Sequence, residues 1–225
     1  MPGTLSIVAT PIGNLEDITL RALRILKEVD LIACEDTRRT LKLLNHFGIK
    51  KRLISYFEHN ELGRLPEILS LLKAGQNVAL VSDAGTPTIS DPGFPLVREA
   101  VACGIRVEPI PGPCAAITAL ATSGLPTDRF LFIGFLPQKR GKRRSLLESL
   151  RDEEGTIILY ESPHRILKAL TDIASVLGNR PLVIVRELTK VHEEFVRGSA
   201  DEISRSLQGA EIKGEFVVLV AGNQR

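Results

Sequence analysis

Charged and polar residues gather in this sequence directly after short apolar runs, where they could bind a ligand or move a proton. The most unusual stretch is VSDAGTPTISDPG, residues 81–93, which follows the apolar run NVALV and holds two aspartates, two glycines and two prolines. Glycine permits close backbone approach or a positive φ, and proline stiffens its neighbours. The stretch could be a phosphate cradle, a tight turn capped by its own aspartates, or the floor of a site for another ligand.

Phosphate binding is poorly supported by the motifs present. A Walker loop needs GxxxxGK followed by Ser or Thr, and residues 81–93 contain no such lysine. A dinucleotide fingerprint needs GxGxxG after the first strand, whereas the first apolar run here leads into ATPIGNLED. Asp83 and Asp91 add negative charge that would repel phosphate. A stiff, mildly acidic loop suits a cationic or amphipathic ligand with a flat ring better.

Three further segments follow apolar runs in the same way. They are ATPIGNLED (9–17), CEDTRRT (34–40) and PIPGPCAAITA (109–119). In a parallel sheet the loops that follow the strands lie on one edge, which is where ligands bind in open α/β sheets. The sequence therefore predicts one site at this edge.

The elements that would position these loops alternate along the first half of the chain. Apolar runs of strand length begin at Leu5, Leu31, Arg52, Asn77 and Val107, and helical patterns lie between them. Continuous apolar runs are typical of parallel strands buried on both faces. We expect an α/β domain over residues 1–115 with helices on both faces of a mostly parallel sheet. Asp17 is the expected N-cap of the first helix, and Gly48 and Gly75 the expected helix C-terminal glycines.

The second half predicts a different sheet. Residues 183–199 read as two strands joined by a short turn with no room for a crossover helix, which indicates antiparallel pairing in a mixed sheet. The helical segment within 111–129 is bracketed by Pro and Gly and marks the domain junction. The second α/β domain is therefore expected over residues 116–225.

Composition limits the class of protein. The chain has 225 residues, 44% hydrophobic content and a net charge of +2, typical of an ordinary globular protein. No apolar stretch approaches the ~20 residues that span a membrane, and the first residues lack the sections of a signal peptide. The three cysteines and four histidines lack metal-ligand spacing. We expect a cytoplasmic protein with no metal and no membrane contact.

The segments VATPIGNLEDIT, ACEDTRRT, VSDAGTPTISDPG, PIPGPCAAITAL and ESPHR together resemble the tetrapyrrole methylase superfamily. Within it they are most similar to the small-subunit ribosomal RNA cytidine-2′-O-methyltransferases. The resemblance runs from Ser6 to the last strand. It implies S-adenosyl-L-methionine as cofactor, bound in a cleft between two α/β domains, a homodimer, and ribosomal RNA or the small ribosomal subunit as partner.

Two departures from the family's patterns accompany this resemblance. The tetrapyrrole branch carries Gly-Asp-Pro in the 81–93 loop, and Thr86 stands at the aspartate position here, which argues against a precorrin or uroporphyrinogen substrate. Members that act on RNA often carry a further small C-terminal segment, and this sequence ends at GNQR.

By the resemblance, the cofactor would be bound by residues of both halves of the chain, the last of them near Gly214. These are Pro11, Ala84, Gly85, Thr86, Ile89, Cys114, Ala115, Ala116, Tyr160 and Glu215.

Methyl transfer to a ribose hydroxyl is helped by a base that accepts the hydroxyl proton. Asp36 is the favoured candidate because it lies at a strand end beside the cofactor edge. An ion pair with Arg38 is the alternative role for Asp36, and Arg165 offers the same alternative to the carboxylate of Glu161. The candidates as a group are Glu35, Asp36, His59, Glu161 and His164.

A basic run could bind the RNA. QKRGKRRS places five cations within six positions, which indicates either a solvated face or a phosphate-binding arm. His164 and Arg165 follow Pro163 at an expected helix start, where they could contact phosphate or ribose, or simply cap the helix. The predicted RNA-binding residues are Lys139, Arg140, Lys142, Arg143, Arg144 and Arg165.

Two other functions remain compatible with the sequence. One is a methylase of the same superfamily acting on a small molecule or a protein side chain. The other is a ribosome-binding protein that uses the cleft only to sense a ligand. The basic run and Thr86 count against a tetrapyrrole substrate and leave a protein substrate open.

Overall fold

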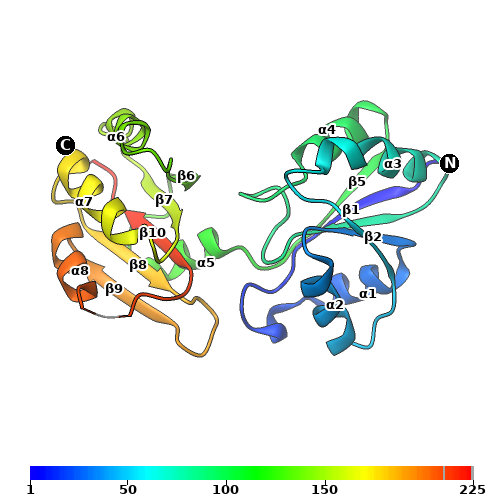
Figure 1. The fold of residues 1–225 in the computed structure, drawn as a ribbon, viewed down its shortest axis with the longest axis horizontal. Helices are drawn as coiled ribbons and strands as arrows, with labels where there is room; N and C mark the ends of the chain where they lie inside the picture. Colours follow the sequence, from blue (N-terminus) through cyan, green and yellow to red (C-terminus); the bar gives the residue numbers. More distant parts are fainter. Residues whose placement is uncertain (210, 224–225) are drawn as a thin grey trace. The chain divides into compact units, whose positions relative to one another are not determined.

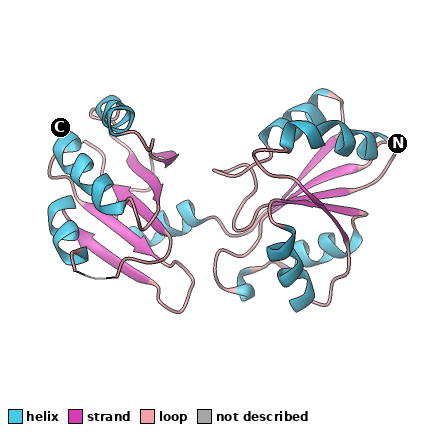
Figure 2. Cartoon of the chain, viewed as in Figure 1, coloured by secondary structure: helices cyan, strands magenta, loops and turns pink. Residues whose placement is uncertain are grey.

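The computed structural model describes residues 1–209 and 211–223. They form two compact units, Met1–Cys114 and Ala115–Arg225 (Figure 1). Each unit is an α/β layer structure with its own five-stranded sheet (Figure 2). The predicted fold class is confirmed.

The first unit is built on a fully parallel sheet in the order β3-β2-β4-β1-β5. Helices α1 and α2 cover one face of this sheet, and α3 and α4 cover the other (Figure 1). The elements are β1 (Thr4–Val8), the short 3-10 helix η1 (Leu15–Asp17), α1 (Leu20–Glu28), β2 (Leu31–Cys34), α2 (Thr37–His46), β3 (Arg52–Ser55), α3 (Glu61–Lys73), β4 (Val78–Val81), α4 (Phe94–Ala102) and β5 (Arg106–Ile110).

The central strands are continuous apolar runs because both of their faces are buried. Along β2, Ile32 and Cys34 pack with the α1 and α2 side, whereas Leu31 and Ala33 pack with the α3 and α4 side. All four residues are buried. This double burial fixes the register of the strand, and so the positions of the residues that follow it.

The helix ends follow the expected chemistry with one exception. Gly48 and Gly75 adopt φ values of 65° and 91° after α2 and α3, as predicted for helix C-terminal glycines. The predicted N-cap of α1 is wrong. Asp17 ends the preceding 3-10 turn, and the hydroxyl of Thr19 instead accepts from the Ala22 N–H at 3.0 Å. Both residue types cap well, and the turn Leu15–Asp17 places the threonine at the helix start.

The second unit contains a mixed sheet in the order β6-β7-β10-β8-β9. Strands β6 and β7 are parallel, and β10 is antiparallel to both of its neighbours. The predicted strand pair within 183–199 is confirmed as the antiparallel pair β8 and β9. The elements are α5 (Ala115–Ser123), β6 (Phe130–Phe135), α6 (Arg140–Ser149), β7 (Thr156–Glu161), α7 (Ile166–Leu177), β8 (Leu182–Arg186), β9 (Glu194–Gly198), α8 (Ala200–Leu207) and β10 (Phe216–Val220).

Helices α6, α7 and α8 share one apolar core on one face of this second sheet. Helix α5 packs against β7 and β10. Across the described part of the chain, every helix is too short or too polar to cross a membrane.

Candidate active site

The carboxyl edge of the first sheet is closed by direct bonds between its loops. Thr10 follows β1 and Gly85 follows β4, and their backbones exchange hydrogen bonds of 2.9 and 3.0 Å. The Thr86 hydroxyl donates to the Pro113 carbonyl at 3.1 Å, which adds the loop after β5. Loops far apart in the sequence therefore form one rim, as expected for parallel strand ends.

The loop after β4 holds an unusual backbone. Gly85 and Gly93 have φ values of 81° and 131°, which confirms that the glycines serve a positive φ. Thr88 and Ser90 also adopt positive φ, at 74° and 62°, where residues other than glycine are strained. The Glu61 carboxylate accepts from the Gly93 N–H at 3.3 Å and holds the far end of the loop.

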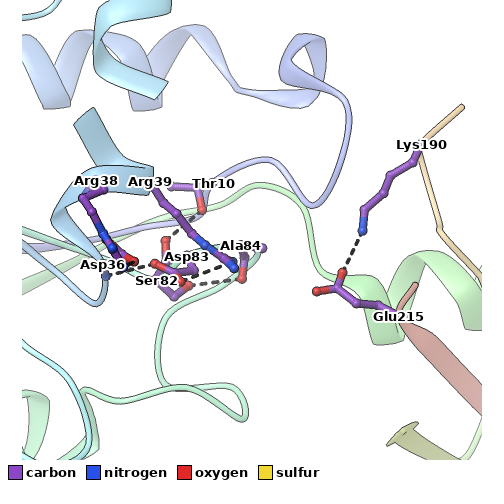
Figure 3. Close-up of polar contacts among 9 residues, drawn as sticks. All are labelled: Thr10, Asp36, Arg38, Arg39, Ser82, Asp83, Ala84, Lys190 and Glu215. Carbon is purple, nitrogen blue, oxygen red and sulfur yellow. Dashed lines mark hydrogen bonds and ion pairs between the residues drawn. The ribbon is translucent and has the colours of Figure 1, made fainter. Parts of the chain in front are cut away.

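Asp83 joins the ends of two strands (Figure 3). One carboxylate oxygen accepts from the Asp36 N–H at 3.0 Å, and the other lies 3.3 Å from Nη1 of Arg39. The buried Thr10 side chain donates to the Ser82 carbonyl at 3.3 Å, and the Ser82 hydroxyl donates to the Ala84 carbonyl at 3.2 Å. The rim is therefore held by side chains as well as by backbone bonds.

The rim carries more negative than positive charge. Burial, followed by the charge of Asp83, raises the pKa of Glu35. Burial also raises the pKa of Asp91 to about 6, with added repulsion from Glu35 and Asp83 and an opposing hydrogen bond from Ser82. Among the described residues, neither Glu35 nor Asp91 forms an ion pair. Carboxylates so arranged favour a cationic group.

Asp36 is engaged by its own helix. Its carboxylate caps α2 by accepting from the Arg38 N–H at 2.8 Å, and it pairs with the Arg38 guanidinium at 2.8 Å. The hydrogen bonds from Arg38 hold the pKa of Asp36 well below its usual range. A carboxylate so stabilised is a weak proton acceptor, which counts against Asp36 as the base, and the identity of the base stays a prediction. Glu35, one residue earlier, has the more suitable pKa.

The other three predicted bases lie on other segments of the chain. His59 is exposed in the turn after β3, with its ring 6.0 Å from that of Phe57. Glu161 ends β7 with 2% of its surface exposed and pairs with Arg165 at 3.3 Å. His164 is exposed in the turn before α7, which begins at Ile166 and not at His164 as predicted. Glu161 and His164 belong to the second unit, and His59 follows β3 at the carboxyl edge of the first sheet.

The predicted cofactor residues of the first unit lie on or beside the rim. Pro11 and Gly85 are buried, Ala84, Thr86 and Cys114 are half-buried, and Ile89 is exposed. In the second unit, the Ala116 N–H at the start of α5, next to Ala115, donates to the Tyr160 hydroxyl at 3.1 Å.

Glu215 in the second unit belongs to a separate ion-pair group. Nζ of Lys190 lies 3.0 Å from the Glu215 carboxylate (Figure 3). The same nitrogen lies 2.9 Å from Glu187. Glu187 and Thr189 both have positive φ, so these ion pairs stabilise a strained turn between β8 and β9.

The basic run divides into exposed and internal cations. Lys139, Arg140 and Lys142 are exposed at the start of α6. Arg143, by contrast, is 6% exposed and pairs with the buried Asp172 at 2.7 Å, so it is not available to phosphate. Its position one helical turn before the buried Leu147 explains this correction.

The two remaining predicted RNA contacts are also engaged within the second unit. Arg144 donates to the Ser175 hydroxyl at 3.1 Å. Arg165 donates to the Leu136 carbonyl and pairs with Glu161. Both guanidinium groups therefore stabilise contacts within the second unit, and this role is separate from any contact with RNA.

Sequence reasoning recognised Asp83 and Asp91 as the acidic charge of the loop but assigned no individual role to four of the residues that build the rim. Thr10 and Ser82 are buried polar residues directly after buried strands, and Asp83 and Asp91 flank the glycine-rich loop. A buried polar residue at a strand end signals a site because its burial has to be compensated by hydrogen bonds.

The two-sheet fold with its acidic, backbone-lined rim has counterparts among the methylases. The family of tetrapyrrole (corrin/porphyrin) methylases matches residues 4–204. Three relatives, each named ribosomal RNA small subunit methyltransferase I, are similar over nearly the whole chain. They come from Halalkalibacterium halodurans (55% identity, 98% of this chain and 76% of the relative), Thermotoga maritima (51%, 99% and 100%) and Escherichia coli O157:H7 (53%, 99% and 79%).

Solved structures share the fold at lower sequence identity. Uroporphyrin-III C-methyltransferase from Thermus thermophilus, complexed with S-adenosyl homocysteine, has a TM-score of 0.66 at 19% identity, covering 97% of both chains. Diphthine synthase has a TM-score of 0.73 at 16% identity, covering 99% of this chain and 92% of that one. The chain belongs to the tetrapyrrole methylase family and is an S-adenosylmethionine-dependent methyltransferase.

The residues present fit this cofactor. Glu35, Asp83 and Asp91 outnumber Arg39 at the rim and complement a sulfonium and an ammonium group. Gly85 has no Cβ beside Ile12 and the Pro113 carbonyl, so backbone atoms line the loop.

Proposed function

We propose that this methyltransferase modifies the ribose 2′-hydroxyl of a cytidine in small-subunit ribosomal RNA. The observation that carries the proposal is the identity of 51–55% to relatives named for that ribosomal RNA, over 98–99% of this chain. Exposed Lys139, Arg140 and Lys142 support it because lysine and arginine neutralise RNA phosphates.

The cofactor supplies an electrophilic methyl group, and this chain's residues bind and orient the reactants. The rim carboxylates stabilise positive charge, and the joined loops hold the backbone lining in place. We assign Glu35 as the residue that accepts the hydroxyl proton, because its raised pKa keeps it more basic than Asp36. Aligning the reacting groups accounts for several kcal/mol of the barrier.

The remaining cofactor contacts are proposed for Ala116 and Tyr160, and for the turn near Glu215. The bond from the Ala116 N–H to the Tyr160 hydroxyl supports this assignment because it fixes the phenol ring at the start of α5. We further propose a homodimer that acts in the cytoplasm, where ribosomal subunits assemble. Light scattering after gel filtration measures the oligomeric state.

Mass spectrometry of small-subunit RNA incubated with the protein and labelled cofactor tests the function. We expect one ribose-methylated cytidine. A methyl group on a base, on a protein or on a small molecule would replace this proposal with another methylase activity. Absence of transfer to naked RNA and to assembled subunits would reject it. Running both substrates also identifies which of the two the enzyme uses.

A further inference from the structure

A β-bulge near the end of β6 controls which way its last side chain points. The register with β7 pairs Phe132 with Ile158 and then shifts, so that Gly134 pairs with Leu159 and Phe135 with Tyr160. Ile133 is the extra residue. Gly134 has a φ of 74°, a conformation that suits glycine at a bulge.

The bulge reverses the alternation of side chains along the strand. Without the shift, Phe135 would fall opposite Glu161, on the face of Leu159 and the apolar core. With it, Phe132 and Phe135 both lie on the face of Tyr160. Bulges of this kind re-aim a side chain and are common beside active sites.

The result is a cluster of three aromatic rings. The ring centroids of Phe132 and Phe135 lie 5.0 and 5.8 Å from that of Tyr160, both edge-on. The Tyr160 hydroxyl is fixed by the Ala116 N–H. Phe135 nevertheless keeps 54% of its surface exposed. Its strand, β6, lies at the edge of the sheet (Figure 1). A rigid aromatic ring is thus presented to a ligand.

The cations that follow identify the kind of ligand. Lys139, Arg140 and Lys142 are exposed a few residues beyond Phe135. Exposed aromatic rings beside cations are the means by which proteins hold unpaired nucleotides, with the ring stacked on the base and the cations on the phosphates. We propose that Phe135 stacks on an unpaired base of the RNA substrate, a role that rests on the proposed RNA-methylating function.

Substitutions at Phe135 test this directly. Phe135→Ala is expected to weaken binding of a single-stranded oligocytidine RNA about tenfold. Phe135→Tyr is expected to restore affinity, whereas Phe135→Leu, which keeps the apolar bulk, is not. The melting temperature of Phe135→Ala is expected to stay close to that of the wild type, because the ring is half exposed, and this separates loss of stacking from unfolding. Phe130→Ala is the matched control, since Phe130 is 43% exposed at the other end of the same strand.

A spectroscopic readout is available because the chain contains no tryptophan. In Phe135→Trp the single indole should be quenched when the RNA stacks on it, and in Phe130→Trp it should not. Unchanged affinity in Phe135→Ala, full rescue by Phe135→Leu, or equal quenching at both positions would overturn the inference. If the wild type binds and methylates RNA while any of these holds, only the stacking role fails. A wild type that neither binds nor methylates RNA rejects the stacking role and the proposed function together.

Discussion

The backbone N–H of Asp36 donates to the carboxylate of Asp83 at 3.0 Å, so the end of β2 is bonded to the end of β4. The same carboxylate holds Arg39 at 3.3 Å. Asp83 thus fixes the start of α2 next to the loop that we assign to the cofactor. Its role is to position this loop, and its loss should affect binding before it affects chemistry.

Asp83→Ala is expected to weaken binding of S-adenosylmethionine and to lower the free energy of unfolding by about 1–2 kcal/mol, because the Asp36 N–H loses its acceptor. Asp83→Asn keeps an acceptor oxygen, so it should lose less cofactor affinity and less unfolding free energy than Asp83→Ala. Calorimetric titration and urea unfolding measure the two effects. Glu67→Ala, which removes an exposed carboxylate on α3, is the control. Equal losses in the control would contradict the positioning role.

Glu35→Gln is expected to lower kcat by about 10²–10⁴, as for loss of a general base, and also to weaken cofactor binding because it removes one of the rim's negative charges. Asp36→Asn should leave kcat near the wild-type value, and the asparagine side chain can still cap α2. In the wild type, kcat should fall as pH drops through the raised pKa of Glu35, because the protonated carboxyl cannot accept a proton. If Asp36→Asn has the larger effect on kcat, the assignment is reversed.

Asp91 makes stability depend on pH. Its folded-state pKa of about 6 lies above its unfolded value, so the folded state binds more protons between about pH 4 and 6. Stability contributed by this group is therefore present at low pH and lost as pH rises through 6. Asp91→Asn should raise the melting temperature at pH 8 and leave it unchanged near pH 4. Because solvent screens the partly exposed carboxyl, we expect Asp91→Asn to raise the free energy of unfolding at pH 8 by only about 1 kcal/mol. Equal gains at both pH values would show that ionisation is not the cause.

Arg143 and Lys142 should behave in opposite ways. Arg143→Ala removes the nearest of three arginines that pair with the buried Asp172 and leaves Arg140 at 3.6 Å and Arg144 at 3.7 Å, so it is expected to cost about 1–3 kcal/mol of unfolding free energy. Lys142 is exposed, so Lys142→Ala should change the free energy of unfolding by less than about 0.5 kcal/mol. Replacing Arg143 and Asp172 together with Met and Leu should recover much of the loss. Thermal unfolding of the three variants distinguishes a structural ion pair from an RNA contact.

The exposed cations should act mainly on RNA affinity, and Arg140 in addition lies 3.6 Å from the carboxylate of Asp172. Replacing Lys139, Arg140 and Lys142 with Gln is expected to reduce the slope of log K against log salt by about 2, since each phosphate contact to a single strand contributes about 0.7. The same change at three exposed lysines of the first unit, Lys27, Lys42 and Lys50, is the control. An equal reduction in both triple variants would indicate general charge and not a binding surface.

The two sheets and the rim loops were predictable because apolar periodicity and glycine-proline loops are local signals. The orientation of side chains within the rim was not. Glu35 and Asp36 are adjacent, and only the start of α2 at Thr37 makes Asp36 a cap. Arg143 stands in a run that reads as solvated, and its partner Asp172 is 29 residues away in the sequence. Contacts of this range depend on the assembled fold.

The reciprocal bonds between Thr10 and Gly85 also determine how the rim can open. Each residue is both donor and acceptor for the other, so neither loop can release its amide to solvent while the other stays closed. The two loops should therefore exchange amide hydrogens as one cooperative unit, although 75 residues separate them along the chain. Access to this edge of the sheet would then be governed by a single opening event.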